Sequence, residues 1–176
     1  MDRRFALKNL TLSGMGLALS PALLSALEGC TPAYDPGYVL QSLSPAQDQL
    51  LAQLVEIIIP TTETPGARAA GVNQYIDRVF ARVSEPNEKT KFLNGLDKLS
   101  ETDFLEMNEV EQIETLRSWE KSSDPLESEF FSTLKDMTIY GYYTSEIGAS
   151  QELKYVHATG FYNGDLPYDE IGKNFY

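Results

Sequence analysis

Apolar residues recur at helical spacing along most of this chain. The clearest case lies between residues 44 and 60, where one face is apolar and the opposite face carries glutamine, aspartate and glutamate. Ser44 followed by Pro45 is a typical helix start, because serine caps the first turn and proline fits the first helical position. Pro60 ends this helix, since it disfavours the α conformation at Ile59. The apolar face comprises Leu50, Leu51, Leu54, Val55 and Ile58.

Four further stretches show the same spacing. The second helix is expected to begin at about Ala69 or Val72 and to end at Val83. A third is expected over 88–99, after a break at 84–87. A fourth over 109–121 has Asn108 as its cap, and a fifth begins at Asp124-Pro125 and runs towards Tyr143. The fold class predicted is therefore all-α, a small bundle of about five helices.

The pattern ends at Thr144. Beyond it, glycines alternate with tyrosines and phenylalanines without a regular period, which predicts an irregular aromatic C-terminal arm. Residues 31–43, with two prolines and a glycine, are predicted to be an extended tether rather than a packed element. The expected domain is thus 44–176, the helices together with the arm.

Residues 1–30 are typical of an export signal. Arg3-Arg4 precede Leu7-Lys8 and an apolar run over 10–27, a pattern that resembles the twin-arginine signal for export of folded proteins. Pro21 interrupts the run, so a membrane-spanning helix of about 20 apolar residues is not expected. The alternative is a basic amphipathic N-terminus on a cytoplasmic helix. The signal predicts a periplasmic protein.

Cys30, the single cysteine, ends the apolar run. Its position after Leu27-Glu28-Gly29 resembles the site at which bacterial lipoproteins are cleaved and acylated, although Glu28 fits that pattern poorly. Lipidation, which would anchor the protein to a membrane, a disulfide to another subunit and a free thiol all stay open.

The chain is strongly acidic, with a formal net charge of −12 over 176 residues. Residues 1–30 hold three basic and two acidic side chains, so 31–176 carry 11 basic and 24 acidic ones, a net charge of −13. Such a surface repels phosphate backbones, and nucleic acid is excluded as a partner.

No pattern in the sequence indicates an active site or a cofactor in this chain. His157 is the single histidine, which leaves no histidine pair for a metal, and Cys30 lies in the signal region. No glycine pattern is typical of a flavin or nicotinamide site. Paired carboxylates occur on polar helix starts and loops, where a structural role is expected. These pairs are Glu101/Asp103, Glu109/Glu111 and Glu127/Glu129.

Three stretches instead indicate a protein interface: 57–67, 138–148 and 155–168. They are rich in proline, glycine and tyrosine and poor in lysine, as protein interfaces are. One core cannot easily bury three tyrosines within four residues of a helix. The alternative is that these rings pack on the domain's own loops. The predicted interface residues are Pro60, Pro65, Gly66, Tyr140, Tyr142, Tyr143, Tyr155, Phe161 and Tyr162.

The first two stretches resemble the gluconate 2-dehydrogenase subunit 3 family, also called the gamma or small subunit. The likeness spans roughly Leu43 to Asp165, and its motifs combine into a fairly specific pattern. The matching motifs are Ile58-Ile59-Pro60, Pro65-Gly66-Ala67, Gly141 to Ser145, Ile147-Gly148 and Tyr162-Asn163-Gly164.

This resemblance implies a non-catalytic partner of a large FAD-containing flavoprotein of the glucose–methanol–choline type, in some complexes with a cytochrome c subunit. It implies that the small subunit carries the signal read by the twin-arginine export machinery. No catalytic residue carries over to this chain. The alternatives are a free-standing exported lipoprotein that binds a ligand or the cell wall, and an enzyme in its own right. The substrate would be set by the large subunit.

Overall fold

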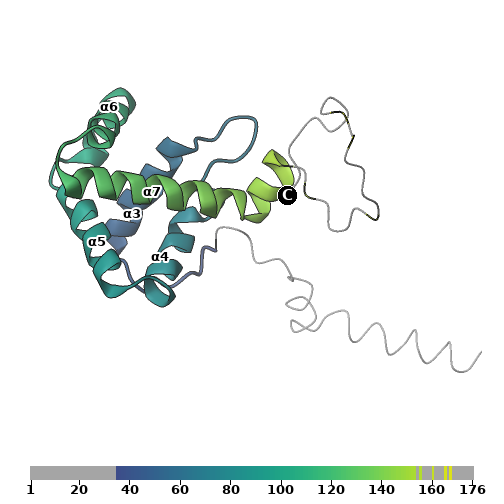
Figure 1. Ribbon diagram of the computed structural model, residues 1–176, viewed down its shortest axis with the longest axis horizontal. Coiled ribbons are helices and arrows are strands. Elements are labelled where there is room, and N and C mark those ends of the chain that lie inside the picture. The colour runs from purple at the N-terminus through teal and green to yellow at the C-terminus, as the bar shows by residue number, and fades with distance from the viewer. Residues whose placement is uncertain (1–34, 154, 156–159, 161–164, 166, 168–176) are drawn as a thin grey trace, which may run out of the picture. The chain divides into compact units, whose positions relative to one another are not determined.

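The fold is seen in a computed structural model that describes residues 35–153, 155, 160, 165 and 167. The described part consists of helices and the loops between them and contains no strand, which confirms the all-α prediction (Figure 1). Arg3, Arg4, Leu7, Lys8 and Cys30 of the predicted signal lie outside the described residues. The helices are α3 Pro45–Ile58, α4 Val72–Arg82, α5 Pro86–Ser100, η1 Phe104–Glu106, α6 Glu109–Glu120, α7 Pro125–Tyr143 and η2 Gly148–Glu152.

The helix starts follow the capping chemistry expected from the sequence. The Ser44 and Asn108 side chains accept hydrogen bonds from the N–H groups of the third residues of α3 and α6, and Asp124 caps α7 ahead of Pro125. α5 begins at Pro86, two residues before the expected start. Proline suits a first helical position, and the Glu88 carboxylate accepts the backbone N–H of Glu85.

Helix α7 organises the bundle, because it packs against α3, α4, α5 and α6 (Figure 1). The core beneath it contains a row of aromatic rings. Phe92 lies between Phe80 and Phe130, with ring centroids 4.6 and 4.9 Å apart, and Trp119 meets Phe130 edge-on at 5.6 Å. Gly95 makes this approach possible, since a Cβ there would lie 2.6 Å from the Phe130 ring.

The segment before α3 is held against α4 by a buried carboxylate. Asp77 is fully buried and accepts hydrogen bonds from the backbone N–H groups of Gln41, Ser42 and Leu43 and from the Tyr38 hydroxyl, at 2.7–2.8 Å. Burial alone would raise the pKa of Asp77, but these donors outweigh it and leave that pKa below its usual value. The prediction of an unpacked tether is therefore wrong for residues 38–43.

Other side chains of α4 extend this attachment towards Asp35. The Gln74 side-chain amide bonds both backbone groups of Asp35, accepting from its N–H at 3.0 Å and donating to its carbonyl at 2.8 Å. One turn further along α4, the Arg78 guanidinium lies 5.3 Å from the centre of the Tyr38 ring. Polar groups at helical spacing on α4 thus hold the non-helical segment 35–43.

Helical structure continues past Tyr143, the expected end of the last helix. Instead of an irregular arm from Thr144 onward, the chain forms one short π-helical element, η2, that packs on α7. Gly148 allows this turn because a Cβ there would collide with the Tyr142 carbonyl oxygen. Of the arm beyond Leu153, most residues lie outside the described part. No described helix combines the length and apolar character needed to cross a membrane.

Candidate partner interface

A hydrogen bond joins the two family-like stretches, which are far apart in sequence. The Tyr142 hydroxyl of α7 donates to the Pro65 carbonyl oxygen at 2.9 Å. Next to it, the Thr64 hydroxyl meets the Glu152 carboxylate of η2 at 3.0 Å. The loop after α3 and the C-terminal end of α7 therefore form one continuous surface.

Glu56 of α3 shapes this loop from within. One carboxylate oxygen accepts the backbone N–H and the hydroxyl of Thr61, at 2.9 and 2.7 Å, and the other accepts the N–H of Arg68 at 3.1 Å. Gly66 passes directly over this carboxylate, where a Cβ would lie 2.6 Å from both of its oxygens. The loop is thus held by its own polar contacts, and its glycine is required by a close approach.

The structure corrects two of the predicted interface residues. Tyr142 is 1% exposed, and Gly66 is buried within the loop. Neither residue can therefore contact a partner. Tyr142 is buried because its ring lies in the core while its hydroxyl reaches a carbonyl acceptor, which removes the cost of burying it. These two residues build the surface rather than line it.

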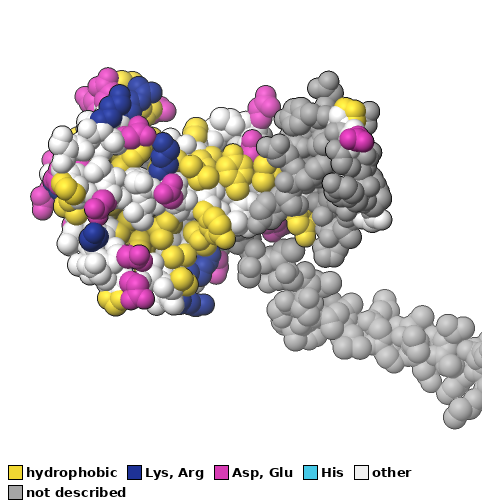
Figure 2. Space-filling view, in the orientation of Figure 1, with side chains coloured by type: hydrophobic (Ala, Val, Ile, Leu, Met, Phe, Trp, Pro, Cys, Tyr) yellow, Lys and Arg dark blue, Asp and Glu magenta, His cyan; other side chains and the backbone are white. Residues whose placement is uncertain are grey.

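The other predicted residues are more accessible. Pro60 is exposed, Pro65 and Tyr143 are half-buried, and Tyr140 is 63% exposed. The three neighbouring tyrosines thus have three different environments, as expected for rings that one core cannot bury together. Figure 2 shows hydrophobic side chains gathered over the C-terminal half of α7. Tyr155 is exposed, while Phe161 and Tyr162 lie outside the described residues.

Tyr75 of α4 also belongs to this surface. Its ring lies 6.3 Å from that of Tyr140, and it packs where Gly141 leaves space on α7. Burial and the neighbouring Tyr140 raise the pKa of Tyr75. The half-buried Tyr75 and the exposed Ile139 and Tyr140 form what we call the tyrosine face. The polar hydroxyl of Tyr75 among the apolar residues of α4 is the signal in the sequence that could have indicated a position at the edge of the core.

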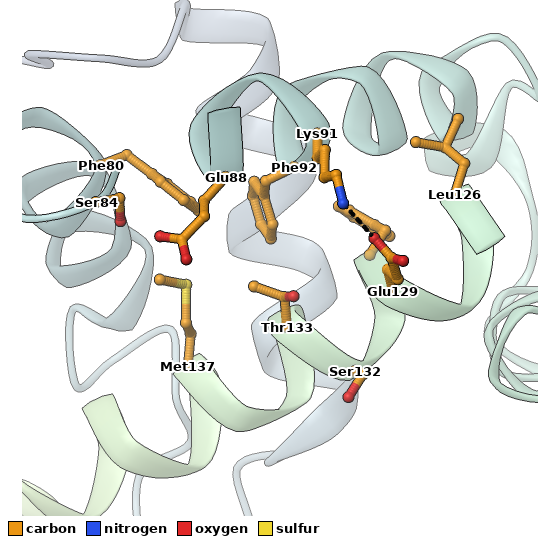
Figure 3. A pocket seen from close by; sticks show the side chains of 11 residues that line it. Phe80, Ser84, Glu88, Lys91, Phe92, Leu126, Glu129, Ser132, Thr133 and Met137 are labelled. Carbon is orange, nitrogen blue, oxygen red and sulfur yellow. Dashed lines mark hydrogen bonds and ion pairs between the residues drawn. The ribbon is translucent and has the colours of Figure 1, made fainter. Parts of the chain in front are cut away.

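A second surface feature is the shallow recess between α5 and α7, about 380 Å³ in volume (Figure 3). Its floor is the aromatic row of the core. Glu88 and Met137 face each other at one end, and the Lys91 ammonium pairs with the Glu129 carboxylate at 3.0 Å at the other. No histidine or cysteine lines it. Its ion pair is exposed on both sides, and such pairs contribute little to stability.

Three of the six paired carboxylates make structural contacts. Glu111 caps the start of α6 by accepting the N–H of Asn108 at 3.0 Å. Glu127 bonds the Lys98 ammonium at 2.7 Å, and this bond lowers the pKa of Glu127, whereas a general acid needs a raised one. Glu129 pairs with a lysine of α5. Within the described residues, no group of three or more His, Cys, Asp or Glu side chains could hold a metal ion.

These features define a small all-α domain with a tyrosine-bearing surface built from two distant stretches. The family model of gluconate 2-dehydrogenase subunit 3 matches residues 45–160, and the chain belongs to this family. It is thereby a subunit of a dehydrogenase complex. Searches of curated proteins and of solved structures found no match to the chain.

Proposed function

We propose that this chain is the non-catalytic small subunit of a periplasmic, flavin-dependent dehydrogenase that oxidises gluconate or another sugar. In this proposal it binds and stabilises a large FAD-containing subunit of the glucose–methanol–choline type, which holds the substrate site. Family membership over 45–160 carries the proposal. The tyrosine face supports it, because Tyr140 is exposed on a helix and tyrosine is enriched at protein interfaces.

The proposal includes the route of export. The twin-arginine pattern of Arg3-Arg4 would direct the folded pair through the twin-arginine machinery, so that a large subunit without a signal of its own travels with this one. Cys30 would then anchor the complex by lipidation or link it to another subunit, and a cytochrome c subunit would accept the electrons.

Co-expression with a large flavoprotein subunit of the glucose–methanol–choline type tests the binding role. We expect a stable complex that co-elutes in size-exclusion chromatography at micromolar concentration, with dehydrogenase activity towards an artificial acceptor in the complex and none in this chain alone. Separate elution of the two proteins would refute the proposal, and activity of the single chain would refute its non-catalytic part.

Replacing Arg3 and Arg4 by lysine tests the escort role. We expect the large subunit's activity to stay in the cytoplasmic fraction of the mutant. Normal export of the large subunit from that strain would contradict the escort role while leaving the binding role intact.

A further inference from the structure

A groove lies between α3 and α6, and none of its lining residues belongs to the tyrosine face. Its volume is about 690 Å³, and the apolar part of its lining is Ile57, Pro60, Leu105, Met107 and Ile113. The polar part includes Gln53 of α3, whose side-chain amide donates to the Gln112 side chain of α6 at 3.1 Å. The groove therefore combines apolar side chains with polar ones.

The groove is distinguished by charge. Its lining residues lie within 49–61 and 105–113, which together contain four acidic residues and no lysine or arginine. The three acidic residues of the second stretch, Glu106, Glu109 and Glu111, are exposed. Between them in sequence or next to them, Leu105 is 43% exposed and Val110 is 65% exposed. Apolar side chains thus lie within a surface of one sign, which internal ion pairs do not neutralise.

The acidic residues of this wall differ from those elsewhere in the described part. Glu120, Asp124, Glu127 and Glu129 each pair with a lysine of their own chain. Among the described residues, Glu106 and Glu109 form no ion pair, and no lysine or arginine lines the groove. Like-charge crowding beside exposed apolar surface is unfavourable in isolation and is relieved by a basic, apolar partner.

We propose that this groove binds a segment of the large dehydrogenase subunit that presents apolar side chains flanked by lysine or arginine. The inference rests on the proposed function. Charge complementarity selects this occupant over a second copy of the chain, since two copies would bring two acidic walls together. The α3–α6 groove and the tyrosine face then make two separate contacts with the partner. Charge attraction favours the first contact, and packing of aromatic rings favours the second.

Carbodiimide cross-linking of the purified complex tests this assignment, because the reagent joins a carboxylate to a lysine in direct contact. We expect links from Glu106, Glu109 or Glu111 to lysines of the large subunit. Links to the partner that arise only from Glu88 or Asp136, on the α5 and α7 side, would overturn the proposal. Links between two copies of this chain would assign the groove to self-association and would overturn it as well.

Two variants give an independent measurement. Leu105→Lys places a cation in the groove, and Glu106→Lys reverses one wall charge. We expect each to weaken the complex by about tenfold or more, because an ammonium facing basic residues is repelled and one covered by the partner's apolar side chains loses hydration. The control is Val83→Lys, at a residue that is 77% exposed at the end of α4, which should change the affinity by less than about twofold.

The outcomes separate this inference from the proposed function. If the wild-type chains form no complex, both fail. If they form a complex whose affinity is unchanged in Leu105→Lys and Glu106→Lys, with folding verified by urea unfolding, the groove assignment alone fails. A wild-type affinity that does not fall as salt is raised would also contradict the charge-steered contact.

Discussion

The Tyr142 hydroxyl donates to the Pro65 carbonyl oxygen at 2.9 Å, across 77 positions of sequence. This bond connects the middle of a loop to the last turn of α7, so the shape of one depends on the position of the other. A surface built from both can be rigid only while this bond and the Glu56 contacts hold the loop. The first predictions concern this attachment.

Tyr142→Phe removes the hydroxyl and keeps the ring. We expect the free energy of unfolding to fall by about 1 kcal/mol, and by up to about 3 if the Pro65 carbonyl stays unsatisfied. Urea unfolding measures the change. Tyr140→Phe is the matched control, since that ring is exposed, and it should leave the free energy within about 0.5 kcal/mol. Equal effects of the two substitutions would contradict the role given to this bond.

Gly66→Ala places a methyl group against the Glu56 carboxylate and the Thr61 backbone nitrogen, 2.6 Å from each. Because the backbone nitrogen cannot move aside freely, we expect a loss of about 1–3 kcal/mol in the free energy of unfolding. Gly37→Ala serves as the control, since its nearest neighbour is a side-chain oxygen of Asp35 at 3.3 Å. An unchanged free energy of unfolding in Gly66→Ala would show that the loop can shift at no cost in stability.

Asp77→Asn weakens the attachment of residues 38–43 to α4. The amide keeps one acceptor oxygen but turns an N–H group towards backbone donors, so we expect a loss of about 2–4 kcal/mol in the free energy of unfolding. Limited proteolysis should then cleave near Tyr38 while the helical circular dichroism signal persists. Asp136→Asn, at an exposed position of α7, should leave both measurements unchanged.

The same attachment predicts a dependence on pH. Burial, the hydrogen bond to Asp77 and the charge of that carboxylate raise the pKa of Tyr38 to about 12. An unfolded tyrosine has a pKa of about 10. The contribution of the Tyr38 hydroxyl to the free energy of unfolding is therefore fully present below pH 10 and is lost as the pH rises to about 12. The difference in unfolding free energy between wild type and Tyr38→Phe should shrink over that window.

At acid pH, stability changes with pH in the opposite direction, because Asp77 loses its charge as the pH falls. The pKa of Asp77 is lowered in the folded state, so its contribution is present above the unfolded value of about 3.9 and is lost as the pH falls through the folded value. The wild type should therefore lose stability below about pH 4 more steeply than Asp77→Asn does. Parallel curves for the two proteins would contradict this.

Tyr140→Asp tests the tyrosine face. A charge at this exposed position should leave the free energy of unfolding within about 0.5 kcal/mol but weaken binding of the large subunit by about tenfold or more, as loss of an aromatic anchor does. Thr144→Asp, also exposed on the same end of α7, is the charge-matched control. Equal binding by wild type and Tyr140→Asp would remove this face from the interface.

Local patterns alone predicted much of this protein. The helices, their caps at Ser44, Asn108 and Asp124, and the class of fold follow from 3.6-residue periodicity and side-chain-to-backbone bonds within a few positions. The family resemblance likewise rests on residues read in order. Each of these properties depends on residues that are close in sequence, so each could be predicted without the tertiary structure.

The tertiary structure alone decided the burial of several polar and aromatic side chains. Aspartate is usually a surface residue, yet Asp77 is buried because the backbone of 41–43 offers it hydrogen-bond donors. Tyr142 is buried and Tyr140 exposed because α7 meets the Pro65 loop on one side only. The acidic groove exists because residues of 49–61 and 105–113 lie side by side. Contacts between distant residues determine these features, and no local periodicity encodes them.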